Sequence, residues 1–186
     1  LADYGAEVIK IEPPSGDLTR AIGPRRNDNM GAFFLTSNRN KRSIVLDLKN
    51  SKADKILRRL IAKSDVVLHS IRSSATKRIG LSYEQVREIN PSVIYCHVKG
   101  FSDEGLKGGK PAYDDVSQAV SGLAMMLTPL TGEPRYVPSI LGDKITAVHA
   151  AMAVMAAVVH RQATGEGQRI DVPMFETMAA FNMVEH

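Results

Sequence analysis

Asp143 is the residue of this 186-residue chain whose position best suits covalent chemistry. It stands in Leu141-Gly142-Asp143-Lys144, and the apolar run behind it predicts a long helix over Asp143–Arg161. A carboxylate at a helix start usually caps free backbone N–H groups. The same groups carry partial positive charge and keep the carboxylate ionised, and an ionised carboxylate can attack an acyl carbonyl. Gly142 leaves room for a substrate to approach. Spacing alone does not decide between cap and nucleophile.

A second acidic segment, Tyr113-Asp114-Asp115, stands at the start of a helix predicted over Asp114–Leu127. Its simplest interpretation is two capping acids beside a half-buried tyrosine. The functional alternative is a polar pocket wall that faces Asp143. No Ser–His or Cys–His pair suggests another nucleophile and base. The histidines are scattered and His149 stands on an apolar helix, so no metal site is predicted.

The net charge of +4 and the pI of about 9.2 favour an anionic partner. Nucleic acid is disfavoured, because the chain has no Trp, only 5% aromatic residues and no nucleic-acid motif. A solvated surface and a phosphorylated cofactor remain open as explanations of the basic cluster. The cluster consists of Arg20, Arg25, Arg26, Arg39, Lys41 and Arg42.

The cysteine count and the longest apolar run bear on the compartment and on contact with a membrane. Cys96 is the single cysteine and permits no internal disulfide, which fits a reducing, cytoplasmic location. The most apolar run, Ile145–His160, is too short to cross a bilayer as it stands, so no membrane partner is expected.

The elements that must position these residues alternate between strands and helices. The helix opened by Ser51 carries its apolar residues on one face, and Ser51 can cap it; these residues are Ala53, Ile56, Leu57, Leu60 and Ile61. The helix behind Asp143 is apolar around most of its circumference, so it is predicted to be buried on most sides. Strands are predicted over Ala6–Ile11, Ser43–Leu48, Asp65–His69, Ser92–Val98 and Gln168–Val172, and further helices over Ser51–Ala62, Ser82–Ile89 and Met174–His186. This alternation predicts the α/β class, with a Rossmann-like parallel sheet covered by helices on both faces.

Glu12 stands at the end of the first predicted strand. In a Rossmann dinucleotide site, an acid there binds the ribose hydroxyls. The glycine fingerprint of such a site would precede Leu1. A nicotinamide-dependent enzyme is therefore one alternative.

Taken together, ordered sequence blocks resemble the class III CoA-transferases over essentially the whole chain. That family includes formyl-CoA transferase, carnitine CoA-transferases and the α-methylacyl-CoA racemases. No single block is diagnostic, and their order and spacing carry the resemblance. The blocks are Leu1–Glu12, Gly16-Asp17, Thr19-Arg20, Asn38–Lys49, Asp65–Val67, Asn90-Pro91, Gly100-Phe101, Tyr113-Asp114, Gln118-Ala119, Ser121-Gly122, Leu141–Asp143 and Thr164–Gln168.

The resemblance implies a domain organisation and a set of partners. Residues 1–186 would form part of the large, CoA-binding domain, with a strand and loop before Leu1 and a smaller domain after His186. The substrates would be an acyl-CoA and a carboxylic acid acceptor, with no permanently bound cofactor. The family forms homodimers in which two chains interlock.

The resemblance also implies roles for individual residues. Asp143 matches the catalytic aspartate, which forms a mixed anhydride with the acyl group and then a thioester with CoA. Tyr113 and Asp114 match pocket positions beside it. The CoA nucleotide would be held by Leu46, Lys49 and Arg78, in a groove also lined by Ser70, Ile71 and Ile79. Lys and Arg suit the phosphate charges of CoA.

Three departures from the family pattern qualify these roles. Pro13 replaces a CoA-contacting arginine, so that contact is lost or supplied by Arg20. His69-Ser70-Ile71-Arg72 replaces a usual Glu-Asn-Phe-Arg, which puts the CoA contacts there in question. Tyr113 stands where the racemases carry a proton-transferring histidine. A tyrosine with an ordinary pKa near 10 is a poor base at neutral pH, which favours transfer over racemisation. A racemase and a non-catalytic acyl-CoA-binding subunit remain alternatives.

Overall fold

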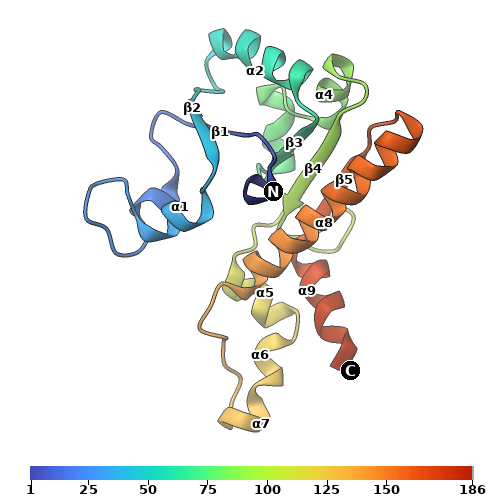
Figure 1. Cartoon of the computed structure of the whole chain (residues 1–186). Helices are drawn as coiled ribbons and strands as arrows, with labels where there is room; N and C mark the ends of the chain where they lie inside the picture. Colours follow the sequence, from blue (N-terminus) through green and yellow to red (C-terminus); the bar gives the residue numbers. More distant parts are fainter. Residues whose placement is uncertain (186) are drawn as a thin grey trace. The chain divides into compact units, whose positions relative to one another are not determined.

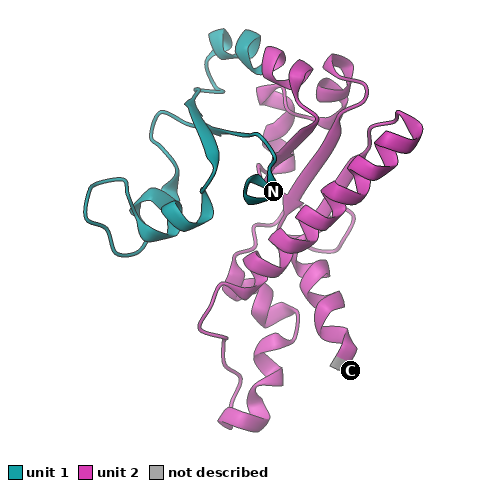
Figure 2. Ribbon diagram, viewed as in Figure 1, with its two compact units in different colours: residues 1–57 teal, residues 58–186 magenta. Residues whose placement is uncertain are grey.

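The computed structural model describes residues 1–185, and the chain divides into two compact units, residues 1–57 and the residues from Arg58 onward (Figure 2). Each unit has its own parallel sheet, β1-β2 in the first and β3-β4-β5 in the second. The predicted α/β class with parallel strands and flanking helices is therefore confirmed. The strands belong to two separate sheets rather than to one.

The first unit is built around the pair β1 (Val8–Glu12) and β2 (Lys41–Val45), in which Val8 is opposite Lys41. Between them lie a 3-10 turn, Leu18–Ala21, and α1 (Ala32–Ser37). Both strands are displaced by about two residues from the predicted ranges. Strand β2 ends early because the chain turns at Asp47, whose carboxylate accepts the Lys49 N–H at 3.0 Å.

Helix α2 (Ser51–Lys63) matches its predicted range closely. Ala53, Leu57 and Ile61 of the predicted apolar face are buried, whereas Ile56 is 43% exposed and Leu60 is half-buried, so the buried stripe is narrower than predicted. The predicted cap is wrong. Asn50 accepts the Lys52 N–H at 3.0 Å, and Ser51 is already the first helical residue.

The sheet of the second unit runs in the order β3 (Val66–His69), β4 (Ile94–Lys99) and β5 (Arg169–Pro173). Strand β4 lies in the middle, and its first four residues are buried. The connection from β3 to β4 contains α3 (Ser73–Thr76), a 3-10 turn over Lys77–Ile79, and α4 (Tyr83–Ile89). Ser82 and Gln85 form a capping box at the start of α4, where the sequence predicted a helix opened by serine.

The connection from β4 to β5 differs from the predicted single helix over Asp114–Leu127. The chain forms α5 (Asp114–Val120), α6 (Leu123–Met126) and α7 (Thr128–Thr131). The break is at Gly122, whose φ of +87° belongs to the left-handed region and cannot continue a right-handed helix.

Helix α8 (Leu141–Thr164) starts two residues before its predicted start and ends at Gly165. It packs against β4, β5, α5 and α9 (Met174–Asn182), as Figure 1 shows. A 3-10 turn over Met183–Glu185 follows α9, and His186 of the predicted last helix lies outside the described residues.

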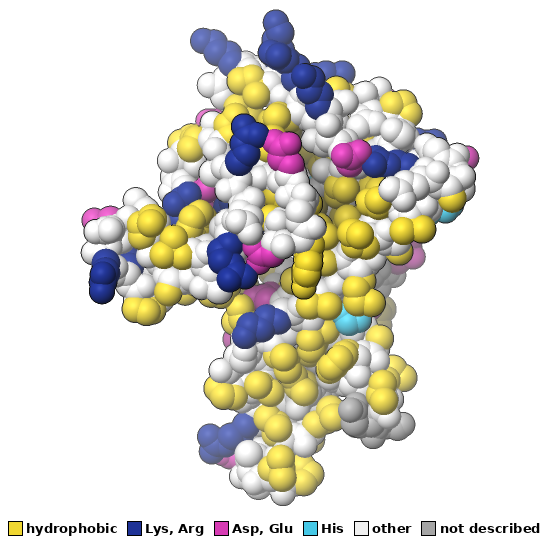
Figure 3. Space-filling model, viewed as in Figure 1, with side chains coloured by type: hydrophobic (Ala, Val, Ile, Leu, Met, Phe, Trp, Pro, Cys, Tyr) yellow, Lys and Arg dark blue, Asp and Glu magenta, His cyan; other side chains and the backbone are white. Residues whose placement is uncertain are grey.

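One face of α8 is buried through Thr146, Ala150, Val154 and Ala157. The other face exposes an apolar stripe made of Val148, Met152, Met155 and Val159, which are 59%, 63%, 53% and 62% exposed (Figure 3). The prediction that this helix is buried on most sides is therefore wrong for the described part of the chain. Apolar residues occupy both faces, so periodicity cannot tell which face the protein covers.

The full length of α8 bears on the membrane prediction. Its 24 residues have the length and apolar composition of a membrane span, a test that core helices of soluble proteins also pass. The helix is therefore longer than the apolar run Ile145–His160, which was predicted from the sequence to be too short to cross a bilayer. The absence of a membrane partner stays a prediction.

Candidate active site

The N-termini of α5 and α8 meet at a pair of carboxylates. Asp143 is the third residue of α8, and its backbone N–H donates to Oδ1 of Asp114 at 3.2 Å. Asp114, from α5, therefore supplies the capping carboxylate for α8. The interpretation of Asp143 as the helix cap is wrong, because another residue fills that role. Its side chain is left exposed at the positive end of the helix.

Gln118 fixes Asp114 in this position. Its side-chain amide donates to Oδ2 of Asp114 at 2.6 Å and to the Ser139 carbonyl at 3.0 Å, and its oxygen accepts the Val137 N–H at 2.8 Å. Gln118 is only 1% exposed. The sequence placed it in a family block without a role, and the structure identifies it as the link between α5 and the segment before α8.

Gly142 has a different role from the one predicted. A Cβ at this position would lie 3.1 Å from Asp114 Oδ1, 3.4 Å from Ser117 Cβ and 3.6 Å from Met174 Sδ. The space beside Gly142 is thus filled by the protein itself. The glycine allows α5 to approach α8 closely enough for the carboxylate cap, and it leaves no gap for a substrate.

The charge of Asp114 influences the ionisation of Asp143. Burial by neighbouring atoms and, secondly, the charge of Asp114 raise the pKa of Asp143 above its ordinary value. This direction is opposite to the lowering expected from the helix N-terminus. Asp143 is the more exposed of the two carboxylates, which is the position required of a group that attacks an incoming thioester.

Tyr113 immediately precedes α5 and is 69% exposed, so it is not half-buried as expected. It stands next to Asp114 in the chain, at the helix end where the carboxylates meet. Its predicted role in the substrate pocket stays a prediction.

The residues predicted to hold CoA fall in both units. In the first unit, Leu46 is 8% exposed and its N–H donates to the Glu12 carbonyl at 2.9 Å, while Lys49 is exposed in the turn after β2. In the second unit, Ser70, Ile71, Arg78 and Ile79 belong to the connection that leaves the carboxyl end of β3. Ligands of parallel sheets commonly bind at this end. Arg78 and Ser70 are exposed there.

Arg20 makes a tight set of contacts inside the first unit. Its guanidinium pairs with both carboxylate oxygens of Glu12 at 2.8 Å and lies 3.8 Å from the centre of the Phe34 ring. These contacts engage Nε and one terminal nitrogen of the guanidinium. A role for Arg20 in CoA binding, in place of the arginine replaced by Pro13, stays a prediction.

Glu12 also accepts the Ser43 hydroxyl at 2.6 Å and the Asp17 N–H at 3.0 Å, and it is 2% exposed. The hydrogen bond from Arg20 is the largest cause that lowers the pKa of Glu12 to about 2. Its two oxygens are thus occupied by protein donors. This arrangement disfavours the nicotinamide alternative, which needs Glu12 to accept the ribose hydroxyls.

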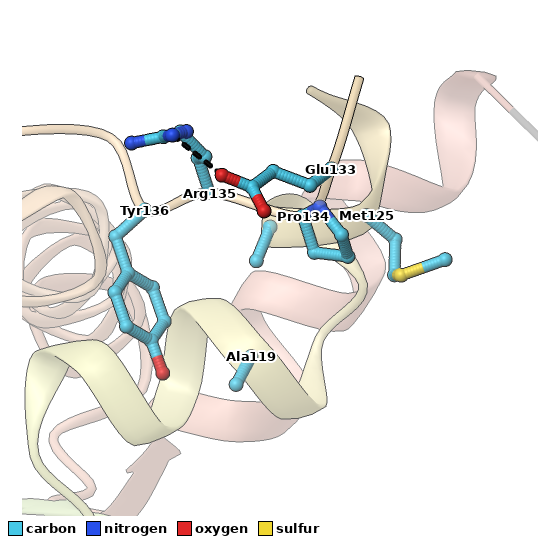
Figure 4. A pocket seen from close by; sticks show the side chains of 7 residues that line it. Ala119, Met125, Glu133, Pro134, Arg135 and Tyr136 are labelled. Carbon is cyan, nitrogen blue, oxygen red and sulfur yellow. Dashed lines mark hydrogen bonds and ion pairs between the residues drawn. The ribbon is translucent and has the colours of Figure 1, made fainter. Parts of the chain in front are cut away.

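A cavity of about 660 Å³ lies beside α5, α6 and the segment Glu133–Tyr136 (Figure 4). Arg135 and Glu133 form an ion pair at its edge. None of the predicted site residues lines it. Within residues 1–185, no group of three His, Cys, Asp or Glu side chains is arranged to hold a metal ion.

Comparison with known proteins places the chain in a family. The family model described as "CoA-transferase family III" matches residues 1–185. The chain belongs to CoA-transferase family III. The resemblance identified from the sequence blocks is therefore confirmed.

Among family III relatives, the succinyl-CoA:mesaconate CoA-transferase of Haloarcula hispanica is 37% identical over 97% of this chain and 48% of its own length. The acetyl-CoA:oxalate CoA-transferase of Acetobacter aceti is 39% identical over 97% of this chain and 47% of its own length. A crystal structure of a CAIB/BAIF family protein from Brucella suis has a TM-score of 0.88 and 34% identity, and covers 98% of this chain and 51% of that one. The chain thus spans about half the length of the relatives that it matches.

Proposed function

We propose that the protein containing this chain is an acyl-CoA:carboxylate CoA-transferase with Asp143 as its covalent nucleophile. The observation that carries the proposal is that the two aspartates have different roles. Asp114 caps α8 through the Asp143 N–H, so the Asp143 carboxylate is exposed and has no capping role. Membership of CoA-transferase family III supports the same reaction class.

In the proposed reaction, an Asp143 oxygen attacks the thioester carbonyl and the C–S bond breaks. This gives an acyl-aspartyl anhydride and a CoA thiolate. The thiolate attacks the aspartyl carbonyl and releases the donor carboxylate, leaving a thioester between Asp143 and CoA. The acceptor carboxylate attacks this thioester to form a second anhydride and release the thiolate. Attack of the thiolate on the acceptor carbonyl yields the new acyl-CoA and restores Asp143.

The acceptor is proposed to be a short dicarboxylic acid. The names of the two relatives include mesaconate and oxalate, which are both dicarboxylic acids. The test is to incubate the full-length protein with a panel of acyl-CoAs and dicarboxylic acids and to identify new CoA thioesters by mass spectrometry. Transfer to a dicarboxylate supports the proposal. A protein that binds CoA but exchanges no CoA would instead be a non-catalytic binding subunit.

The proposed CoA site depends on exposed positive charge at Arg78. Replacing Arg78 with Ala in the full-length protein should weaken CoA binding by about 1–3 kcal/mol, the scale of a lost charge-assisted contact. Lys77, its exposed neighbour in the same 3-10 turn, provides the control, and Lys77→Ala should bind CoA much more nearly like the wild type. Calorimetric titration measures both. Equal CoA affinity of Arg78→Ala and the wild type, or tight salt-sensitive DNA binding by the wild type, would count against the assignment.

Racemisation is the competing activity within the same family, and Tyr113 argues against it. The full-length protein should not incorporate deuterium from heavy water at the α-carbon of a 2-methylacyl-CoA. The reason is that a neutral tyrosine hydroxyl is a much weaker base than the imidazole of the histidine that the racemases carry. Mass spectrometry of the recovered thioester measures the exchange. Incorporation at rates typical of enzymatic turnover would replace transfer by racemisation as the proposed function.

The assembly and location are also proposed, as an interlocked homodimer in the cytoplasm. The apolar stripe on α8 is the kind of surface that an oligomer covers. Light scattering of the full-length protein tests the dimer, and a monomeric mass would exclude it.

A further inference from the structure

Two buried histidines hold the peptide groups of Ile71 from both sides. Nδ1 of His69 accepts the Ile71 N–H at 3.2 Å, and Nε2 of His97 lies 2.8 Å from the Ile71 carbonyl oxygen. His69 and His97 are register partners on β3 and β4, and their ring centres are 4.4 Å apart. They are only 9% and 3% exposed. The backbone just beyond β3 is therefore held by side chains of two neighbouring strands.

The surrounding hydrogen bonds determine where the histidine protons lie. The Tyr95 hydroxyl donates to the Leu81 carbonyl at 2.8 Å, so it must accept from Nε2 of His69, 2.6 Å away. His69 is then a neutral imidazole with its proton on Nε2 and a free acceptor at Nδ1 for Ile71. Because the Ile71 carbonyl can only accept, Nε2 of His97 carries a proton as well. Burial, followed by the proximity of His97, lowers the pKa of His69 to about 4, which agrees with the neutral form.

The next residues of the same segment are held from the loop after β4. The Ser73 hydroxyl donates to the Asp103 carboxylate at 3.0 Å, and Nζ of Lys99, the last residue of β4, donates to that carboxylate at 2.7 Å. Lys99 pairs in turn with Asp171 of β5 at 3.0 Å. The segment that carries Ser70 and Ile71 is thus fixed at two points, by the two histidines and by Asp103.

We propose that His69 and His97 are positioning residues for CoA, which set the backbone at Ser70 and Ile71 without touching the ligand themselves. This inference rests on the proposed function and on the CoA groove at Ser70 and Ile71 that the family resemblance predicts. Rotation of the peptide groups of Ile71 would redirect both the Ser70 and the Ile71 side chains. The histidines prevent this rotation because each peptide group has a buried partner.

The test uses the full-length protein and separates the contact to Ile71 from burial in general. His69→Leu removes the acceptor for the Ile71 N–H, and His97→Leu removes the donor to its carbonyl. Each should raise the Kd for CoA by roughly tenfold, the scale of one buried hydrogen bond left unmade. The kcat at saturating acyl-CoA should change much less than the KM for acyl-CoA. Amide hydrogen exchange should show faster exchange at Ile71 in His69→Leu.

Two variants provide matched controls. Cys96→Ala trims a fully buried side chain of β4 next to His97 but leaves the His69 tautomer and both contacts to Ile71 in place, so it should keep the CoA affinity and the protection of the Ile71 amide. His69→Asn retains an acceptor oxygen near the position of Nδ1 and should restore most of the affinity lost in His69→Leu. If His69→Leu does not fold, His69→Gln takes its place, because its amide reaches toward Tyr95 and lacks the Nδ1 acceptor.

The outcomes distinguish this inference from the proposed function. Folded His69 and His97 variants with wild-type CoA affinity would overturn the positioning role and leave the proposed function standing. The same conclusion follows if Cys96→Ala loses as much affinity as His69→Leu, because the loss would then reflect general destabilisation. A wild-type protein that fails to bind CoA would overturn the proposed function and this inference with it.

Discussion

Replacing Asp143 with Asn in the full-length protein is expected to lower transferase activity by at least ~10³-fold, as when a covalent nucleophile is removed. Asparagine keeps the shape of the side chain but cannot form the anhydride. The capping contact should survive, because it joins the Asp143 backbone N–H to the Asp114 carboxylate. Folding and CoA affinity should therefore stay close to wild type. Steady-state kinetics and calorimetric titration with CoA measure the two effects separately.

The matched control for this experiment is Glu84→Gln, which removes an exposed carboxylate from the first turn of α4. It should leave transferase activity nearly unchanged, since only the general effect of a charge at a helix start is lost. If Asp143→Asn retains most of the wild-type activity, the nucleophile lies elsewhere. Asp114 is then the first residue to examine.

Replacing Glu12 with Gln is expected to lower the free energy of unfolding by about 3 kcal/mol, because it leaves the Arg20 guanidinium without its carboxylate in a largely buried site. Glu12 is 2% exposed and receives hydrogen bonds from Arg20, Ser43 and the Asp17 N–H. Glu7→Gln is the control, since Glu7 pairs with Arg42 at the surface and both side chains are largely exposed. That change should cost less than about 1 kcal/mol. Chemical denaturation of the full-length variants measures both values.

The acid dependence of stability provides a second readout of the same ion pair. The pKa of Glu12 is lowered to about 2 from its ordinary value of 4.5. The stabilisation by Glu12 is therefore fully present above pH 4.5 and is lost as the pH falls from 4.5 toward 2. Glu12→Gln should remove this part of the pH dependence. Equal unfolding free energies for Glu12→Gln and Glu7→Gln would show that the buried pair contributes no more than the exposed one.

Local sequence signals were sufficient for most elements of the fold. The alternating apolar residues around β1 and the helical spacing of Ala53, Leu57 and Ile61 predicted elements within about two residues of their observed bounds. The capping box of Ser82 and Gln85 also acts within one turn of chain. The break at Gly122 was missed, because a single glycine inside a helical pattern is compatible with both a helix and a turn.

The candidate site depended on contacts that no local pattern contains. The cap of α8 comes from Asp114, 29 residues before Asp143 in the chain. The two histidines around Ile71 meet only because β3 and β4 pair in a particular register. The family resemblance supplied the residues of the site, but only the structure shows which side chain contacts which backbone group. Residue type predicted a carboxylate cap for α8 and assigned it to the wrong aspartate.

The most direct test of the central claim is to trap the covalent intermediate. The full-length protein would be incubated with an acyl-CoA substrate, quenched and digested, and the peptide that contains Asp143 examined by mass spectrometry. An acyl or CoA adduct is expected on that peptide; hydroxylamine should remove it, and it should be absent from Asp143→Asn. Active exchange of CoA with no adduct on this peptide, or with an adduct on a different carboxylate, would contradict the central claim.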